Sequence, residues 1–126
     1  MEKLRILIVD DIASMRLLMK QYLRTNDRVV VVGEASDGEE ALRKAQESRP
    51  DVVILDMSMP GIGGVEVTRK MKSLLPSIRV YLCSAYELKE FEKLNLDSPA
   101  DGFIQKSRMK PELLAMLSKE LEQKKS

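Results

Sequence analysis

Apolar residues in this chain follow two patterns: short continuous runs, and positions that recur every three or four residues. The continuous runs predict strands over residues 4–9, 29–34, 52–55, 78–83 and 103–104. The run 52–55 is wholly apolar, which is typical of a central strand of a parallel sheet with helices over both faces. Pro60 and Gly61 follow that run and predict a turn.

Helical spacing recurs between and after these runs and predicts a helix behind each strand. The residues expected on the inner faces of the five helices are, in chain order, Met15, Leu18, Met19, Tyr22 and Leu23; Gly38, Ala41, Leu42 and Ala45; Val67, Met71, Leu74 and Leu75; Leu88, Phe91 and Asn95; and Leu113, Leu114, Leu117 and Leu121. Pro111 stands at the favourable first turn of the last helix, and residues 123–126 are expected to form a solvated tail.

The alternation of strand and helix predicts an α/β fold of the (βα)₅ type, with a parallel sheet and right-handed crossovers. Periodicity alone does not fix the order of the strands in that sheet. A length of 126 residues suits one domain with its own core. Because no linker, repeat or low-complexity segment interrupts residues 1–126, we expect a single domain.

Composition narrows the classes of partner. The 21 basic and 20 acidic residues give a formal net charge of +1, so no net field draws the chain to nucleic acid or to a membrane surface. The single cysteine, Cys83, excludes an internal disulfide and is expected to be a small core residue. No apolar segment reaches signal-peptide or membrane-spanning length, and we therefore expect a cytoplasmic protein.

Polar residues stand at the carboxyl ends of four of the predicted strands. Asp10 and Asp11 follow the first strand, Asp56 the third, Ser84 the fourth and Lys106 the fifth. If these strands are neighbours, the five side chains converge at one edge of the sheet, where open parallel sheets bind ligands. Crowded carboxylates repel one another, and a divalent cation with hard oxygen ligands, such as Mg²⁺, relieves that repulsion.

The same residues favour phosphoryl chemistry. The ammonium of Lys106 and the hydroxyl of Ser84 suit the oxygens of a phosphoryl group, and an aspartate beside the metal can act as the nucleophile. Each residue alone has a plainer interpretation, because an aspartate at a strand end is commonly a turn or helix cap and Lys106 lies in a charged run. Their coincidence at matching strand ends favours a site.

In these residues the chain resembles the receiver domain of two-component response regulators, the CheY-like family. The resemblance covers essentially the whole length and rests on the paired Asp10 and Asp11, the segment Asp56-x-x-Met-Pro60, Ser84-Ala85 and Lys106. It implies a doubly wound, flavodoxin-like sheet with the strand order 2-1-3-4-5, in which strands 1 and 3 lie side by side.

The resemblance also implies the chemistry. Asp56 would accept a phosphoryl group from a phosphohistidine of a sensor histidine kinase or a histidine phosphotransfer protein. Asp11, Asp56 and the backbone carbonyl of Ser58 would ligate Mg²⁺ or Mn²⁺, with Asp10 acting through metal-bound water. Lys106, together with the Ser84 hydroxyl, would hold the phosphoryl oxygens.

A conformational switch is implied as well. Ser84 would be drawn to the phosphoryl group, Phe103 would turn inward, and the surface of the fourth helix, fifth strand and fifth helix would change shape. That surface would contact a downstream protein target or an output domain, or form a homodimer. Direct binding to nucleic acid or to a membrane is not expected.

The chain departs from the family pattern at several positions. Ser107 follows Lys106 where the family usually has proline, so that the bond between them is trans or a strained cis bond. Gly63 replaces a capping aspartate at the start of the third helix. Pro99 replaces a glycine and is expected to end the fourth helix early, near Asn95.

Two residues are expected to set the lifetime of the phosphorylated state. Tyr86, two residues beyond Ser84, is bulky and is expected to shield the acyl phosphate from water. Ser58, two residues beyond Asp56, is the second.

Two other functions stay open. One is a receiver-like protein-binding module without phosphate turnover, which the departures at Ser107 and Pro99 favour. The other is a small metal-dependent phosphatase that works through an aspartyl phosphate, although Ser58 stands where such enzymes usually carry an acid.

The absence of histidine and of a Gly-Lys-Ser/Thr loop argues against a nucleotide triphosphatase, a Ser-His hydrolase and a His-ligated zinc site. We therefore expect a phosphoacceptor signalling domain and not an enzyme. No output domain follows the last helix, so the chain is expected to be either a stand-alone receiver or a piece of a longer regulator.

Overall fold

The computed structural model describes residues 2–59, 62–85, 89 and 100–125, and the statements below concern that part of the chain. Its strands are β1 (Leu4–Val9), β2 (Val29–Ala35), β3 (Val52–Asp56), β4 (Arg79–Ser84) and β5 (Gly102–Gln105). Its helices are α1 (Ala13–Leu23), α2 (Gly38–Ser48), α3 (Gly64–Leu74) and α5 (Met109–Lys125), and η1 (Lys106–Arg108) is a 3₁₀ helix. The helix expected over Leu88, Phe91 and Asn95, and the departure at Pro99, lie outside the described residues.

All neighbouring strands are parallel, and their order is β2-β1-β3-β4-β5, which confirms the predicted doubly wound topology. The register pairs Val9 with Leu55, so that the residues after them, Asp10 and Asp56, lie next to each other at the carboxyl edge. Asp56 is paired with Cys83 on the next strand. The strand order changes direction between β1 and β3, and this switch point is where open α/β sheets bind ligands.

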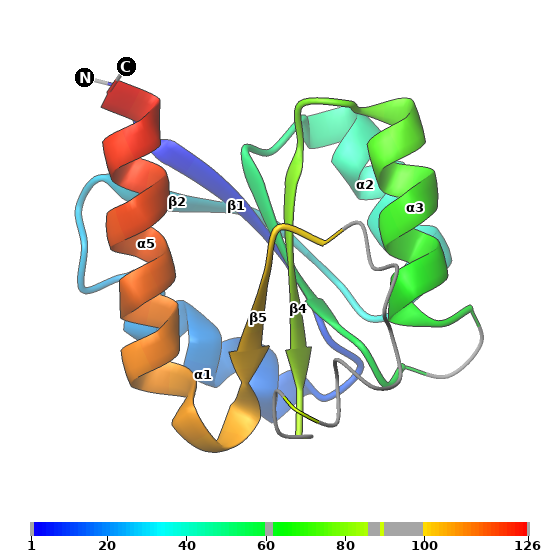
Figure 1. Ribbon diagram of the computed structural model, residues 1–126, viewed down its shortest axis with the longest axis horizontal. Coiled ribbons are helices and arrows are strands. Elements are labelled where there is room, and N and C mark those ends of the chain that lie inside the picture. The colour runs from blue at the N-terminus through cyan, green and yellow to red at the C-terminus, as the bar shows by residue number, and fades with distance from the viewer. Residues whose placement is uncertain (1, 60–61, 86–88, 90–99, 126) are drawn as a thin grey trace.

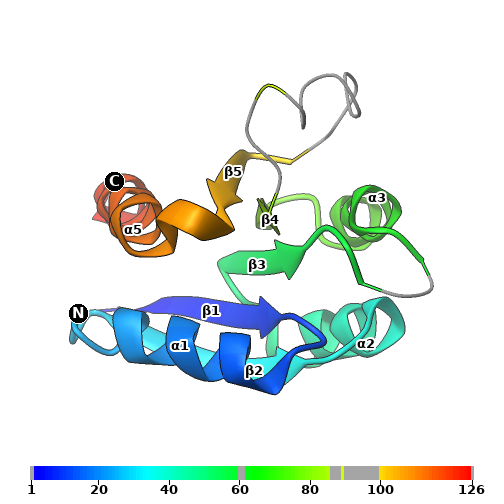
Figure 2. The same ribbon diagram turned by 90° about the horizontal axis from the view of Figure 1, so that it is seen from below.

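Helices cover both faces of the sheet. Figures 1 and 2 show α1 and α5 on one side and α2 and α3 on the other. Because successive side chains of a strand point to opposite faces, β1 places Ile6 and Ile8 in the core beneath α1 and α5, and Leu7 and Val9 in the core beneath α2 and α3. The continuous apolar runs of the central strands follow from this two-sided burial.

The inner faces of α1 and α2 agree with the predicted spacing. Met19 and Leu23 of α1 are fully buried, and so are Ala41 and Ala45 of α2. Two predictions on other helices were wrong, since Leu74 is 51% exposed and Leu114 is 37% exposed.

Both errors have the same cause. An α-helix turns by about 100° per residue, so a residue at the margin of the apolar stripe is exposed when the stripe is centred elsewhere. Buried Thr68 moves the centre of the α3 stripe away from Leu74. In α5, buried Met116 and Glu120 lie on the side opposite to Leu114.

The carboxyl-terminal segment also differs from the expectation of a solvated tail. Helix α5 continues through Lys125. Lys124 Nζ lies 3.1 Å from Asp51 Oδ1 and 3.8 Å from Glu2 Oε2, so the last turn is tied to the start of β3 and to the amino end of the chain. No described helix is long and apolar enough to cross a membrane.

The helices begin in different ways. Asp37 caps α2 by accepting a hydrogen bond from the Glu40 N–H at 2.8 Å, and the Glu40 carboxylate accepts one from the Ser36 N–H at 2.8 Å. Helix α3 begins after Gly63 without a side-chain cap, as the sequence predicts. A Cβ on Gly64 would lie 2.8 Å from Met57 Cα and 3.2 Å from Asp56 O, so the first turn of α3 packs directly on the backbone behind Asp56.

Candidate functional site

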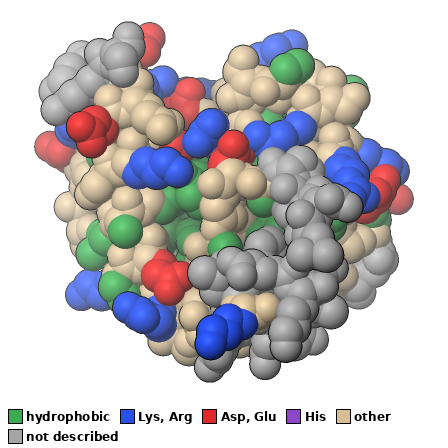
Figure 3. Space-filling model, in the orientation of Figure 1, with side chains coloured by type: hydrophobic (Ala, Val, Ile, Leu, Met, Phe, Trp, Pro, Cys, Tyr) green, Lys and Arg blue, Asp and Glu red, His purple; other side chains and the backbone are tan. Residues whose placement is uncertain are grey.

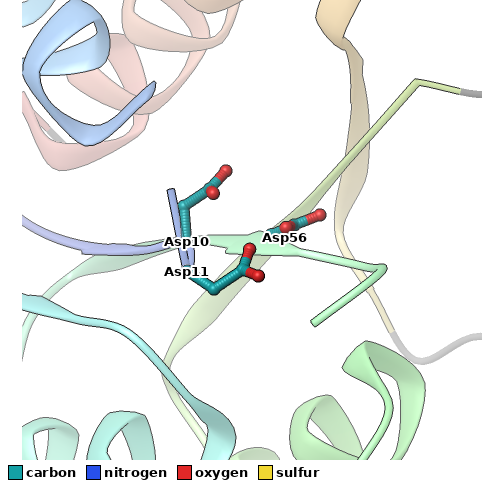
Figure 4. Close-up of side chains that lie close together, drawn as sticks. All are labelled: Asp10, Asp11 and Asp56. Carbon is teal, nitrogen blue, oxygen red and sulfur yellow. The ribbon is translucent and has the colours of Figure 1, made fainter. Parts of the chain in front are cut away.

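Three carboxylates meet at the carboxyl edge of the sheet. Asp10 and Asp11 follow β1, and Asp56 is the last residue of β3. One carboxylate oxygen from each lies within 4.8 Å of the others, and Figure 4 shows the three side chains around a common space. Asp10 and Asp56 are buried, with 0% and 3% exposure, whereas Asp11 is exposed.

A backbone N–H two residues further on orients each buried carboxylate. The Ile12 N–H donates to Asp10 Oδ1 at 2.9 Å, and the Ser58 N–H donates to Asp56 Oδ1 at 3.0 Å. Such turns are a common use of aspartate after a strand. Here they also hold two carboxylates in fixed positions at one pocket.

Lys106 lies across the pocket from these carboxylates. It directly follows β5, and its Nζ lies 3.2 Å from Asp10 Oδ2 and 3.4 Å from Asp56 Oδ1. Its side chain is 17% exposed, so the ammonium is largely shielded from water. The bond between Lys106 and Ser107 is trans, which is one of the two alternatives that the sequence left open.

Burial and neighbouring charges shift the pKa of Asp56 and of Lys106. Burial is the strongest influence on Asp56 and raises its pKa; the Ser58 N–H and Lys106 lower it and Asp10 raises it, and the net pKa lies above the usual value. Burial lowers the pKa of Lys106, but the charges of Asp56 and Asp10 outweigh burial and leave that pKa raised. The ammonium therefore stays charged at neutral pH.

The pocket fits a hard divalent cation. Asp10 Oδ2 is buried and has no hydrogen-bond partner among the described residues, and its contact with Lys106 Nζ is an ion pair. One ammonium faces three carboxylates, so negative charge remains in excess. An all-oxygen donor set with one exposed member, Asp11, suits Mg²⁺, which keeps several of its waters.

Of the other predicted residues, the structure describes Ser84 and Phe103 but not Tyr86. Ser84 is buried at the end of β4 and is paired in register with Gln105, the residue before Lys106. Phe103 is half-buried against the core beneath α2 and α3. Tyr86 lies outside the described residues, so its effect on the lifetime stays a prediction.

Sequence reasoning missed two residues that support the site. Gly64 allows α3 to approach the backbone of Asp56 and Met57. Arg16 donates from Nη1 to the backbone carbonyl of Asp10 at 2.7 Å. The role of Gly64 could have been inferred from the sequence, because the pair Gly63-Gly64 follows a strand and a turn. The contact of Arg16 with the Asp10 carbonyl is visible only in the tertiary structure.

Two described cavities lie away from the carboxylates. One, of about 470 Å³, lies at the amino edge of the sheet and is lined by residues such as Leu4, Asp51 and Ile78. The other is a hollow between β5 and α5 with Phe103 and Met116 in its lining, and Figure 3 shows apolar side chains at its floor. Neither includes the pocket of the three aspartates.

The Cys83 thiol, next to Asp56 in the sheet, gives a first test of these positions. It is buried, and burial raises its pKa to about 12. Because only the thiolate reacts with disulfide reagents, we expect labelling at about pH 8 to be slower in the folded than in the urea-unfolded protein by on the order of 10³. A folded protein labelled at the unfolded rate would contradict this burial.

The comparisons with known proteins agree with this geometry. The pattern described as "Response regulator receiver domain" matches residues 6–118. The response regulator GacA of Pseudomonas viridiflava is 42% identical over 103 residues, which are 82% of this chain and 48% of GacA. The chain spans about half the length of the curated relatives it matches.

Solved structures share the fold over nearly the whole chain. The response regulator domain of Thermotoga maritima CheB is 32% identical with a TM-score of 0.84, and the match covers 96% of this chain and 98% of that one. A chain in the CheX-CheY-BeF₃-Mg²⁺ complex of Borrelia burgdorferi is 26% identical with a TM-score of 0.81, over 92% of this chain and 90% of that one.

Proposed function

The chain belongs to the response regulator receiver family of two-component signal transduction, and from that premise we propose that it accepts a phosphoryl group on Asp56. The observation that carries this proposal is the pocket itself. Asp56 is buried beside two further carboxylates, and Lys106 Nζ lies 3.4 Å from it.

The proposed reaction is a phosphoryl transfer from a phosphohistidine on a sensor kinase or a histidine phosphotransfer protein. A carboxylate oxygen of Asp56 forms a bond to phosphorus while the phosphorus–nitrogen bond breaks, and the imidazole of the donor leaves with the electron pair. The Ser58 N–H holds the carboxylate in place during attack. Lys106 and the Ser84 hydroxyl then hold the phosphoryl oxygens.

The metal proposed for this pocket is Mg²⁺ or Mn²⁺. Asp11, Asp56 and the Ser58 carbonyl would hold it directly, and Asp10 would act through a bound water. When bound, the ion neutralises the charge on the transferring phosphoryl oxygens. Lys106, at the end of β5, supplies a further positive charge next to Asp10 and Asp56.

The pocket also offers a route to a distant surface. The Gln105 N–H, one residue before Lys106, donates to Glu112 Oε1 of α5 at 2.8 Å. A shift of Lys106 or Ser84 toward a phosphoryl group therefore pulls on α5 as well as on β5, where Phe103 lies. We assign the surface that includes β5 and α5 to contacts with a downstream protein, an output domain or a second copy of the chain.

On this proposal the chain is a cytoplasmic signalling domain whose chemistry is limited to gaining and losing its own phosphoryl group. It would not act on external substrates, and its partners would be proteins and not nucleic acid or membranes.

Acetyl phosphate tests the proposal without a cognate kinase. With Mg²⁺ we expect the intact mass to rise by one phosphoryl group, and with excess EDTA we expect no rise, because the negative pocket then repels the donor. A module that only docks to proteins would gain no phosphoryl group in either buffer. A phosphatase would instead hydrolyse a generic phosphate ester over many turnovers.

A further inference from the structure

Three hydrogen bonds hold Asp10, two through its backbone and one through its side chain. Its N–H donates to the Ala35 carbonyl at 3.0 Å, its carbonyl accepts from Arg16 Nη1 at 2.7 Å, and its side-chain Oδ1 accepts from the Ile12 N–H at 2.9 Å. Helix α1 has no side-chain cap at Ile12. Arg16, in the first turn of α1, therefore joins this helix to the end of β1, as the Asp10 side chain does at Ile12.

Arg16 is itself held by a second strand. Its Nε donates to Glu34 Oε1 at 3.1 Å, and Lys20 Nζ lies 2.8 Å from Glu34 Oε2. The Glu34 backbone carbonyl accepts from Lys44 Nζ. The hydrogen bond from Lys20 is the strongest influence on Glu34, and together with Arg16 it lowers the pKa of that carboxyl, so Glu34 is ionised at neutral pH. Glu34 also precedes Ala35, which binds the Asp10 N–H.

The ion pairs of Arg16 and Lys20 with Glu34 are less exposed than typical surface ion pairs. The side chains of Arg16 and Lys20 are 20% and 21% exposed, and Glu34 is 36% exposed. Partly buried pairs are screened less by water and salt than exposed pairs. The guanidinium of Arg16 lies between the Glu34 carboxylate and the Asp10 carbonyl and bonds to both.

We propose that Arg16, braced by Glu34, is a positioning residue of the metal site. It fixes the peptide between Asp10 and Asp11, so that both carboxylates face Asp56 before a metal binds. Neither Arg16 nor Glu34 touches the metal or the phosphoryl group. The inference rests on the proposed function, because it assumes that the three aspartates bind a divalent cation.

The sign of the effect separates positioning from charge. Arg16→Met removes a positive charge near a cation site, and by electrostatics alone the variant should bind Mg²⁺ more tightly than the parent. Loss of positioning should instead weaken Mg²⁺ binding. The metal must then order the Asp10 and Asp11 carboxylates, and this ordering makes the free energy of binding less favourable. Weaker binding by Arg16→Met therefore indicates positioning.

The test is a calorimetric titration of the apo protein with MgCl₂, without phosphodonor. We expect Arg16→Met to weaken Mg²⁺ binding about tenfold, the low end for a residue that orients metal ligands; this corresponds to about 1.4 kcal/mol. Arg43→Met is the matched control. It removes the same charge from an exposed pair with Glu47 on α2, and its affinity should equal that of the parent.

A second pair of variants tests the route through Glu34. Glu34→Gln leaves the Arg16 guanidinium without its carboxylate partner and should weaken Mg²⁺ binding less than Arg16→Met does. The lost negative charge acts in the same direction, so the double variant decides between charge and positioning. If both residues act through the Asp10 carbonyl, the double variant should bind no more than about twofold more weakly than Arg16→Met alone. If the two substitutions act independently, their fold-changes in Mg²⁺ affinity should multiply in the double variant. That result would contradict a shared route through the Asp10 carbonyl.

Folding does not confound these outcomes. Titrations are run well below the unfolding midpoint of each variant, and Arg16→Lys, which keeps the charge but cannot bridge both partners, replaces Arg16→Met if the latter does not fold. A parent that binds no Mg²⁺ would overturn the proposed function and this inference together. A parent that binds Mg²⁺, with Arg16 variants that bind it as tightly, would overturn only the role of Arg16.

Discussion

Asp56→Asn is expected to take up phosphoryl groups from acetyl phosphate at least about 10³-fold more slowly than the parent, because an amide cannot supply the attacking oxygen. The variant should still fold, since the side-chain carbonyl oxygen of Asn can accept the hydrogen bond from the Ser58 N–H that Asp56 Oδ1 accepts. Intact mass after incubation with Mg²⁺ and the donor measures the loss.

The same variant should be at least as stable as the parent at neutral pH. The pKa of Asp56 is raised above its usual value of 3.8, chiefly by burial, so the folded protein binds a proton more tightly than the unfolded chain. A raised acid pKa means that stability falls as pH rises through the window above 3.8. The neutral amide escapes this loss, and its advantage should vanish as the pH is lowered below that window.

Asp27→Asn is the control for this prediction. Asp27 is an exposed aspartate in the turn between α1 and β2. This turn lies at the amino edge of the sheet, and the three carboxylates lie at the carboxyl edge. Its replacement should not change the rate of phosphorylation. Uptake by Asp56→Asn at the parent rate would place the acceptor elsewhere.

The pocket could be predicted from the sequence because each strand is marked twice. An apolar run shows where a strand lies, and the first polar residue after the run shows where the strand ends. Asp10, Asp56 and Ser84 obey this rule, whereas Lys106 stands one residue later, after Gln105. The structure places all four residues at the same edge of the sheet. Their adjacency, however, depends on the strand order, which periodicity does not contain and which the family resemblance supplied.

Other features depend on tertiary contacts that no local pattern records. Glu120 has a sequence environment typical of an exposed helix position, yet it is 3% exposed because Arg79 of β4 lies 3.1 Å away. The errors at Leu74 and Leu114 are of the same kind, since the sheet decides where a helical stripe is centred. The contact from Arg16 to the Asp10 carbonyl joins a helix to a strand end through the backbone, and side-chain patterns do not reveal it.

Lys106→Met is expected to lower the free energy of unfolding of the metal-free protein by about 2–3 kcal/mol near pH 7. Loss of one partner from a buried ion pair costs about 3–5 kcal/mol when the other charge remains buried. Here two carboxylates would remain, Asp10 at 0% and Asp56 at 3% exposure. We place the cost at or below the low end of that range because the Lys106 side chain keeps 17% exposure. Urea titrations of the parent and the variant measure it.

The pH dependence identifies the cause. The folded-state pKa of Lys106 is raised by the charges of Asp56 and Asp10, so its stabilising effect is complete below the unfolded pKa of about 10.4 and is lost as pH rises through the folded value. The effect also shrinks at acidic pH, where Asp56, whose pKa burial raises, becomes protonated. The stability difference should therefore be larger near neutral pH than near pH 3.

Magnesium should distinguish the role of charge from that of packing. Lys106 competes with a divalent cation for the same carboxylates, so Lys106→Met should gain more stability from saturating Mg²⁺ than the parent gains. Phosphorylation should still be slow, because the ammonium that would hold the phosphoryl oxygens is missing.

Lys70→Met, on the exposed side of α3, is the control and should match the parent with and without Mg²⁺. If Lys106→Met were as stable as the parent without metal, the ion pairs at 3.2 and 3.4 Å would not neutralise the buried carboxylates, and the electrostatic account of the pocket would be wrong.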